Sequence, residues 1–235
     1  MIRRQHGFTL IEIAIVLVII GLLLGGVLKG QELITSARVR NLISQQDGVK
    51  AAFFGFLDRY RAYPGDYSQA IANIPGCAAC AQGNNNGQIQ TIVAGGGATD
   101  EQIAVWEHLS RAGFINGSYT YAAGNETPAS APVNPFARYL QMIYDSVYDG
   151  GPTIRHNLKT GNQVPSDILA EVDRKVDDGI ATGGAFRFSA YPGQSGIGGT
   201  APVGAAAGGC YNAPPAVSTW IAATPVNNCG AASLF

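Results

Sequence analysis

The sequence predicts an α+β protein in which one long N-terminal helix precedes a small, loop-rich globular domain containing antiparallel strands. An apolar run extends from Phe8 to Leu28 and continues, without proline, into a polar segment with helical periodicity up to residue 63. The chain also contains 31 glycines and 12 prolines but only 13% charged residues, a composition that favours a loop-rich domain over a helical bundle. We therefore divide the chain into residues 1–7, 8–28, 29–63 and 64–235.

The apolar run has the length of a membrane span. Its 21 residues form a helix of about 31 Å, close to the roughly 30 Å hydrocarbon core of a bilayer. Arg3 and Arg4 precede it, which predicts a cytoplasmic N-terminus and an exported C-terminal part. An ordinary signal peptide has a shorter apolar core and a small-residue cleavage site after it. A plain signal anchor leaves Glu12 unexplained, because a charge within such a span costs about 2.5–3.5 kcal/mol.

The residues at the start of the run form a specific motif, Gly7-Phe8-Thr9-Leu10-Ile11-Glu12. The motif closely resembles the cleavage and methylation motif of type IV prepilins and type II secretion pseudopilins. The resemblance implies that residues 1–7 are a leader peptide, that prepilin peptidase cuts after Gly7, and that the new N-terminus, Phe8, is methylated. Glu12 then becomes the fifth residue of the mature chain, where this superfamily has its characteristic glutamate.

The resemblance also implies a role for Glu12 in subunit assembly. The apolar helices of such filaments bundle at the filament centre, where an unpaired carboxylate is strongly unfavourable. The N-terminal amine of Phe8 on a neighbouring subunit supplies the opposite charge, so that the pair sets the register between subunits. In the membrane-bound monomer, the alternative is a Glu12 that is solvated near the lipid headgroups.

The segment after Leu28 predicts a continuation of the same helix. Gaps of three and four separate many of its apolar residues, including Val49, Phe53 and Phe56, as in an amphipathic helix. Tyr63-Pro64-Gly65-Asp66 supplies a stop and a turn. We expect one helix from about Thr9 to Arg61, with its transmembrane first half in the membrane or filament core and its second half packed on the globular domain of a type IV pilin-like fold.

The sequence of the globular domain, residues 64–235, predicts few helices and strands. Two helices are expected, over Thr99–Ala112 with Asp100 as cap, and from a cap at Ser166 to Gly179. Alternation predicts strands over residues 139–148 and 184–190, and a short helical turn is expected over residues 68–73. The glycine-rich segment Gly193–Gly209 predicts a mobile loop in the C-terminal region.

Four cysteines, Cys77, Cys80, Cys210 and Cys229, are candidates for disulfides in an exported chain. Three pairings are possible, and the spacing favours Cys77 with Cys80 and Cys210 with Cys229. The first pair could instead begin a zinc site, with His108 and His156 as the histidines outside the leader, although this is the less favoured interpretation.

No catalytic, cofactor-binding or metal-binding set of residues stands out, and we expect a protein that is not an enzyme. The turn Asn84–Ile89 resembles a calcium loop only faintly, because amides stand where carboxylates are needed. Asp177 and Asp178 form a second acidic pair, so calcium remains a weaker alternative to no cofactor. The basic and aromatic residues Arg59–Tyr63 are better explained as a helix end packed on its own domain than as a nucleic-acid site.

These features predict a structural subunit of a type IV pilus or a related filament, with partners in prepilin peptidase, an inner-membrane assembly platform and other pilins. The glycine-rich C-terminal region favours a minor or accessory subunit. A pseudopilin of a type II secretion system is the alternative within the superfamily, and a membrane-anchored binding protein that does not polymerise is the alternative of another class. The expected location is the bacterial inner membrane with a periplasmic domain, then a cell-surface pilus or periplasmic pseudopilus.

Overall fold

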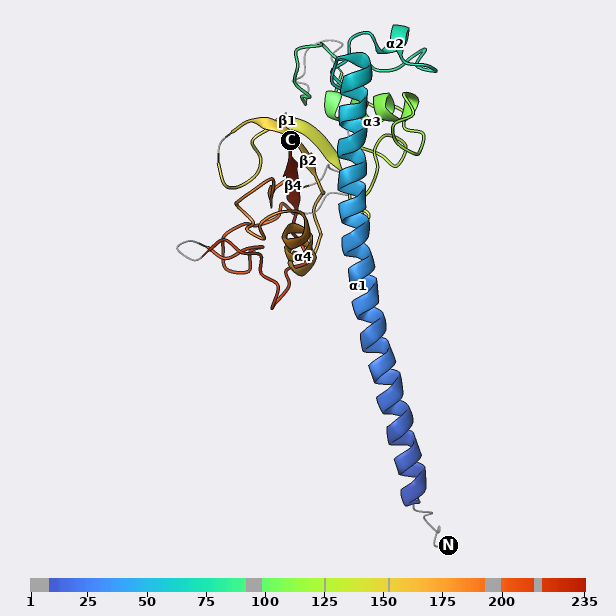
Figure 1. The fold of residues 1–235 in the computed structure, drawn as a ribbon, viewed down its shortest axis with the longest axis vertical. Helices are drawn as coiled ribbons and strands as arrows, with labels where there is room; N and C mark the ends of the chain where they lie inside the picture. Colours follow the sequence, from blue (N-terminus) through green and yellow to red (C-terminus); the bar gives the residue numbers. More distant parts are fainter. Residues whose placement is uncertain (1–8, 92–98, 125, 152, 193–199, 214–216) are drawn as a thin grey trace, which may run out of the picture. The chain divides into compact units, whose positions relative to one another are not determined.

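Four helices and four strands make up the regular structure of the described residues (Figure 1). The computed structural model describes residues 9–91, 99–124, 126–151, 153–192, 200–213 and 217–235. The helices are α1 Leu10–Tyr60, α2 Ala70–Asn73, α3 Glu101–Arg111 and α4 Ser166–Val176. The strands are β1 Gln141–Asp145, β2 Arg155–Lys159, β3 Phe186–Phe188 and β4 Ala231–Leu234. The predicted α+β class and the long N-terminal helix are confirmed.

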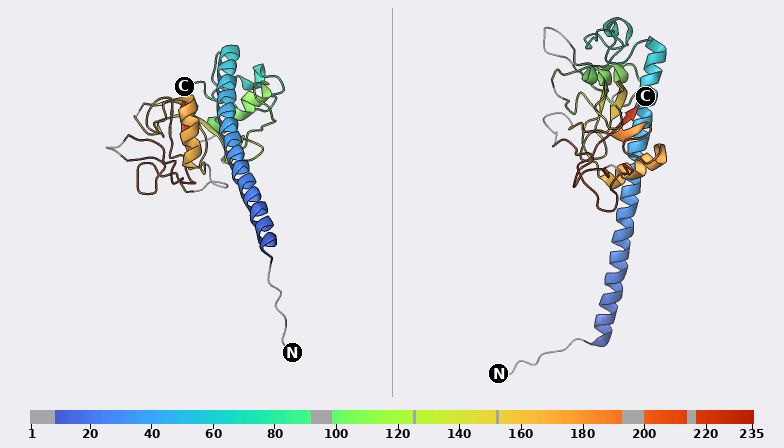
Figure 2. Two further views of the ribbon diagram at one scale, coloured as in Figure 1. Left: turned by 60° about the horizontal axis from the view of Figure 1, so that its bottom comes forward. Right: turned by 90° about the vertical axis from the view of Figure 1, so that its left-hand side faces the viewer.

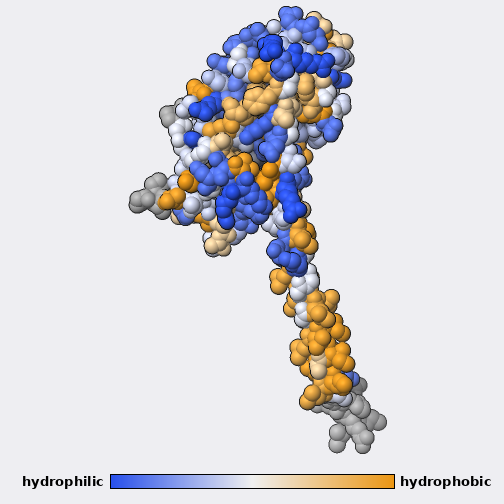
Figure 3. Space-filling view, in the orientation of Figure 1, coloured by the Kyte–Doolittle hydropathy of each residue, from blue (hydrophilic) through white to orange (hydrophobic). Residues whose placement is uncertain are grey.

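The chain forms two compact units, Met1–Arg38 and Val39–Phe235, and the boundary falls within α1. In the first unit, α1 has solvent-exposed side chains from Leu10 to Lys29, and hydrophobic residues cover this part of the helix in Figure 3. Among the described residues, α1 alone contains a stretch long and apolar enough to cross a membrane, with a mean hydropathy of 2.8.

The second unit contains a four-stranded antiparallel sheet in the order β1-β2-β4-β3. The register places Gln141 opposite Lys159 and Asp145 opposite Arg155. Strands β1 and β3 lie within the segments predicted as strands, but each is shorter than expected. Strands β2 and β4 were not predicted. Their sequences, Arg-His-Asn-Leu-Lys and Ala-Ala-Ser-Leu, contain few of the β-branched residues on which strand prediction depends.

The part of α1 that lies in the second unit contributes to two hydrophobic cores. Its buried residues between Val49 and Phe56 pack with Trp106 and Leu109 of α3 and Leu158 of β2. Both views of Figure 2 place the C-terminal end of α1 beside α3. About two and three turns further towards the N-terminus, Leu42 and Val39 belong to the second core. That core also contains α4, β3 and the Cys210–Cys229 region. The apolar stripe of residues 39–60 thus packs against both hydrophobic cores of the domain.

Helices α3 and α4 agree with the expected segments, but their caps differ from the expectation. Asp100 occupies the N-cap position of α3 without making a side-chain cap bond. The N-cap of α4 is Pro165, so the prediction of Ser166 as cap is wrong. The Ser166 hydroxyl instead donates to the carbonyl of Ile221 and accepts the N–H of Val226 at 2.9 Å, because the chain returns beside α4 at this point.

We predict that Phe53→Ala lowers the free energy of unfolding by about 3–5 kcal/mol, the usual range for a buried phenylalanine. Phe53 is 2% exposed and lies 4.8 Å from the Phe235 ring, centroid to centroid. Phe54→Ala is the matched control, because Phe54 is 50% exposed. Denaturant unfolding of the full chain in detergent measures both, and equal losses would contradict this description of the core.

Candidate functional site

A capping box begins α1 at the candidate assembly site. The Glu12 carboxylate accepts hydrogen bonds from the backbone N–H and the hydroxyl of Thr9, each at 2.7 Å. In return, the Thr9 hydroxyl accepts the backbone N–H of Glu12 at 3.3 Å. This reciprocal arrangement satisfies donors at the free end of the helix. The sequence analysis missed the role of Thr9, although the Thr-x-x-Glu spacing is the signal of such a box.

Among the described residues, no other part of the first unit packs against the apolar side chains that follow Glu12. Large hydrophobic residues from Leu10 to Leu28 are between 46% and 88% exposed. Gly21 and Gly25 lie four residues apart on the same helix, and a Cβ at either position would have no neighbouring atom within 4 Å. Such small-residue pairs allow close helix approach. An apolar surface of this extent requires lipid or other protein chains around it in water.

Two of the predicted site residues lie outside the described part of the chain. Gly7 and Phe8 precede the first described residue, Thr9. Cleavage after Gly7 and methylation of Phe8 therefore stay predictions. Glu12 is described, and it stands four residues after Phe8 in the sequence.

The four cysteines form two disulfides, Cys77–Cys80 and Cys210–Cys229, the two pairs that the spacing favours. Every cysteine is thus bonded, which leaves no thiolate for the zinc alternative. The His108 ring bonds to two backbone groups. Its Nδ1 accepts the N–H of Gly65 at 2.9 Å, and its Nε2 lies 2.8 Å from the carbonyl oxygen of Ala81. This bonding requires a neutral imidazole with its proton on Nε2.

The asparagine-rich loop directs backbone N–H groups at two buried carboxylates. Asp66 accepts the N–H groups of Asn86 and Gly87, at 3.0 and 2.8 Å. Glu101, the first residue of α3, accepts those of Asn84 and Gln90, both at 3.0 Å. Burial raises the pKa of Glu101 to about 7, and it also raises the pKa of Asp66.

Two glycines permit this close packing. Gly65 has a φ of +89°, and a Cβ there would lie 2.4 Å from the carbonyl oxygen of Glu101. A Cβ on Gly83 would lie 2.3 Å from the backbone of Asp66. The loop therefore presents donors to the acids rather than oxygens to a cation, and the weaker expectation of calcium at Asn84–Ile89 stays a prediction.

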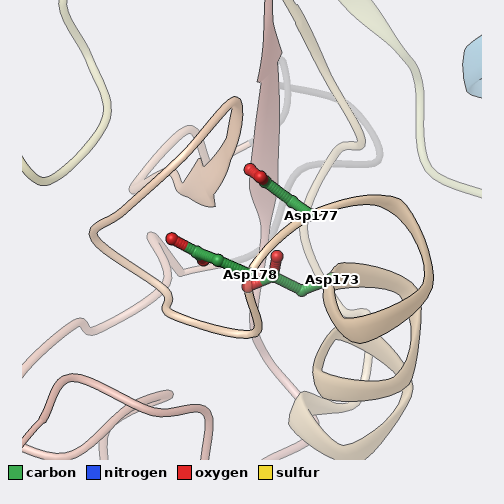
Figure 4. A group of neighbouring side chains, drawn as sticks. All are labelled: Asp173, Asp177 and Asp178. Carbon is green, nitrogen blue, oxygen red and sulfur yellow. The ribbon is translucent and has the colours of Figure 1, made fainter.

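Three aspartates gather at the end of α4 and in the turn that follows it (Figure 4). Asp173 accepts the indole N–H of Trp220 at 2.7 Å and the N–H of Gly179 at 3.3 Å. Asp177 accepts the N–H of Phe186 at 2.8 Å, and Asp178 accepts that of Ile180 at 2.8 Å. The cluster fastens the segment after α4 to the helix and to β3.

A long helix with an uncovered apolar first half, an acid at its start and a small α+β domain after it is an architecture like that of type IV pilins. Comparison with known protein families gives one match: the family model described as prokaryotic N-terminal methylation motif matches residues 2–28. This is the prepilin-type cleavage and methylation motif of type IV pilins and pseudopilins. No curated protein and no solved structure matches the chain.

The aspartate cluster yields a prediction about pH. Burial raises the pKa of Asp173 from 3.8 to about 6. Between these values the folded state holds a proton that the unfolded state has released, so this group makes stability fall as pH rises from about 4 to 6. Asp173→Asn removes the titration. Its melting temperature relative to the unsubstituted protein should therefore be higher at pH 7 than at pH 4.

The matched control is Asp58→Asn, because Asp58 is largely exposed beside Arg61. Its melting temperature relative to the unsubstituted protein should change little with pH, since exposed ion pairs contribute little. A parallel pH dependence in both variants would contradict the assignment to Asp173.

Proposed function

We propose that this chain is a structural subunit of a type IV pilus, inserted in the bacterial inner membrane, processed after Gly7 and assembled through α1. The methylation motif supports a type IV pilin or pseudopilin and indicates a structural subunit rather than an enzyme. The observation that carries the proposal is the exposed apolar surface of α1, which bears a single carboxylate, Glu12, near its start.

The geometry at Thr9 explains how one acid serves two states. In the monomer, Glu12 is satisfied by Thr9 of its own chain. In a filament, the methylated amine of Phe8 on a neighbouring subunit adds a positive charge to the same carboxylate. A charge-assisted bond of this kind is stronger than a neutral one, and more so where water is scarce. Assembly would therefore favour the axial register in which the two groups meet.

The processed chain requires prepilin peptidase, an inner-membrane platform and other pilins as partners, with the domain in the periplasm before assembly. The glycine-rich sequence of residues 193–209 favours a minor or accessory subunit. Residues 193–199, where a mobile loop was expected, lie outside the described part of the chain. The alternative within the superfamily is a pseudopilin of a type II secretion system, whose filament stays in the periplasm. The alternative of another class is a membrane-anchored binding protein that does not polymerise.

Processing has a direct test in the N-terminus of the native protein. We predict that the mature chain begins at Phe8 and carries one additional methyl group, which adds about 14 Da to the chain mass. Intact mass spectrometry with N-terminal fragmentation measures both. A chain that retains residues 1–7, or one cut beyond residue 25 as by a signal peptidase, would contradict the proposal.

Assembly is tested by Glu12→Ala. We predict at least a tenfold loss of sheared surface filaments, with the protein still present in the inner membrane, because the register-setting charge is missing. Glu32→Ala is the matched control, since Glu32 lies on the same helix and pairs with Lys29 at 2.7 Å on the exposed surface. It should assemble normally, as exposed pairs contribute little.

The same pair of variants separates the alternatives. A binding protein that does not polymerise would tolerate Glu12→Ala, so normal function of this variant would refute filament assembly. A pseudopilin would require Glu12 for secretion of its substrates and would yield no surface fibre at native expression levels.

A further inference from the structure

Lys159 is a charged residue in an unusual position, because it is only 1% exposed. It lies on β2, opposite Gln141 of β1 and Ala232 of β4. Its ammonium contacts Oδ2 of Asp145 on the neighbouring strand, and the ring of Tyr191 lies 5.4 Å from Nζ. A lysine amine is thus held against a carboxyl group in a site from which most water is excluded.

The other oxygen of Asp145 faces two N–H donors. Oδ1 accepts the side-chain amide of Asn157 at 2.9 Å and the backbone N–H of Val147 at 3.2 Å. Asp145, Asn157 and Lys159 share one face of the β1–β2 pair, as their alternation along the strands requires. The Asp145 carboxyl carbon therefore has the Lys159 amine on one side. The two donors are directed at Oδ1, the oxygen on which negative charge would develop if this amine attacked the carbon.

We propose that Lys159 and Asp145 condense into an intramolecular isopeptide bond, which joins β1 to β2 covalently. Nζ attacks Cγ of Asp145 and forms the new amide bond, and the Cγ–Oδ2 bond breaks. Two protons move from the ammonium to Oδ2, which leaves as water, while the third remains on the amide nitrogen. An ammonium and a carboxylate thus become a neutral amide and one water molecule, with no oxidant, reductant or other reactant.

Three properties of the site favour this reaction. Burial lowers the pKa of Lys159, although the nearby Asp145 opposes this shift, and the neutral amine is the nucleophile. Contact in a fixed geometry corresponds to an effective concentration on the order of 10⁵ M or more. The donors from Asn157 and Val147 are placed as in an oxyanion hole. A buried ion pair also has a large desolvation penalty, which the neutral amide removes.

The bond would close the β1–β2 hairpin into a covalent ring between residues 145 and 159. The two strands could then no longer separate by loss of hydrogen bonds alone. This inference concerns the globular domain and does not depend on the assembly of α1.

The test is the intact mass of the full-length native protein with its disulfides reduced. The expected result is a chain about 18 Da lighter than its sequence, after allowance for N-terminal processing. Trypsin should leave residues 139–155 joined to residues 156–174, with no cleavage after Lys159, since the modified lysine is not a substrate. A mass without this loss would show a buried ion pair only and would overturn the proposal.

Variants give matched controls for the mass measurement. The Lys159→Arg variant should show no loss of water in its mass. If the variant still shows this loss, the dehydration occurs at another site and the proposal is overturned. Asn157→Ala should yield a reduced crosslinked fraction, whereas complete crosslinking would overturn the assigned role of that amide. Lys175 and Glu171 provide an internal control: they form a 2.6 Å pair with side chains 44% and 39% exposed, and no bond should join these two side chains.

Discussion

An apolar helical surface that its own unit leaves uncovered is the constraint on which the remaining structure depends. From Leu10 to Leu28 the side chains of α1 are exposed, and water is a poor solvent for them. A surrounding phase, either lipid or neighbouring copies, is therefore part of the folded state of this segment. Glu12 is tolerable in both phases only because a donor is always within reach: Thr9 in the monomer, and in the proposed filament an amine from another subunit.

The same helix changes its role at residue 39 because its pattern of apolar residues changes. From Leu10 to Leu28 apolar side chains cover the whole circumference, which suits a uniformly apolar environment. Residues 29–38 are largely polar, and from Val39 onward the apolar side chains follow one stripe that belongs to the two cores of the domain. The first part of this helix thus suits an apolar environment and its last part a protein core, and the local sequence decides where each part begins.

This contrast explains what could be predicted from the sequence. The position of α1, its two halves and the acid at its start follow from local patterns, and so do α3 and α4, whose apolar residues recur at helical spacing. Strand β2 was not predicted because its buried residues include His156, Asn157 and Lys159. Such polar residues are expected at the surface, and only their partners in the folded structure show why they are buried. The anchoring roles of Asp66 and Glu101 were missed for the same reason, since their hydrogen-bond partners lie between 17 and 21 residues away, or 11 in one case.

Buried acids compensate for the scarcity of regular structure in the domain. Strands of three to five residues satisfy few backbone groups, and every buried N–H that lacks a partner is unfavourable. Asp66 and Glu101 each accept two loop N–H groups, so these two buried side chains supply acceptors that a longer sheet ladder would otherwise provide. The consequence is electrostatic: burial raises the pKa of Glu101 to about 7, and it also raises the pKa of Asp66. The loop around Asn84–Gln90 is therefore ordered by groups whose charge state depends on pH, whereas residues 39–60 of α1 are held mainly by apolar contacts.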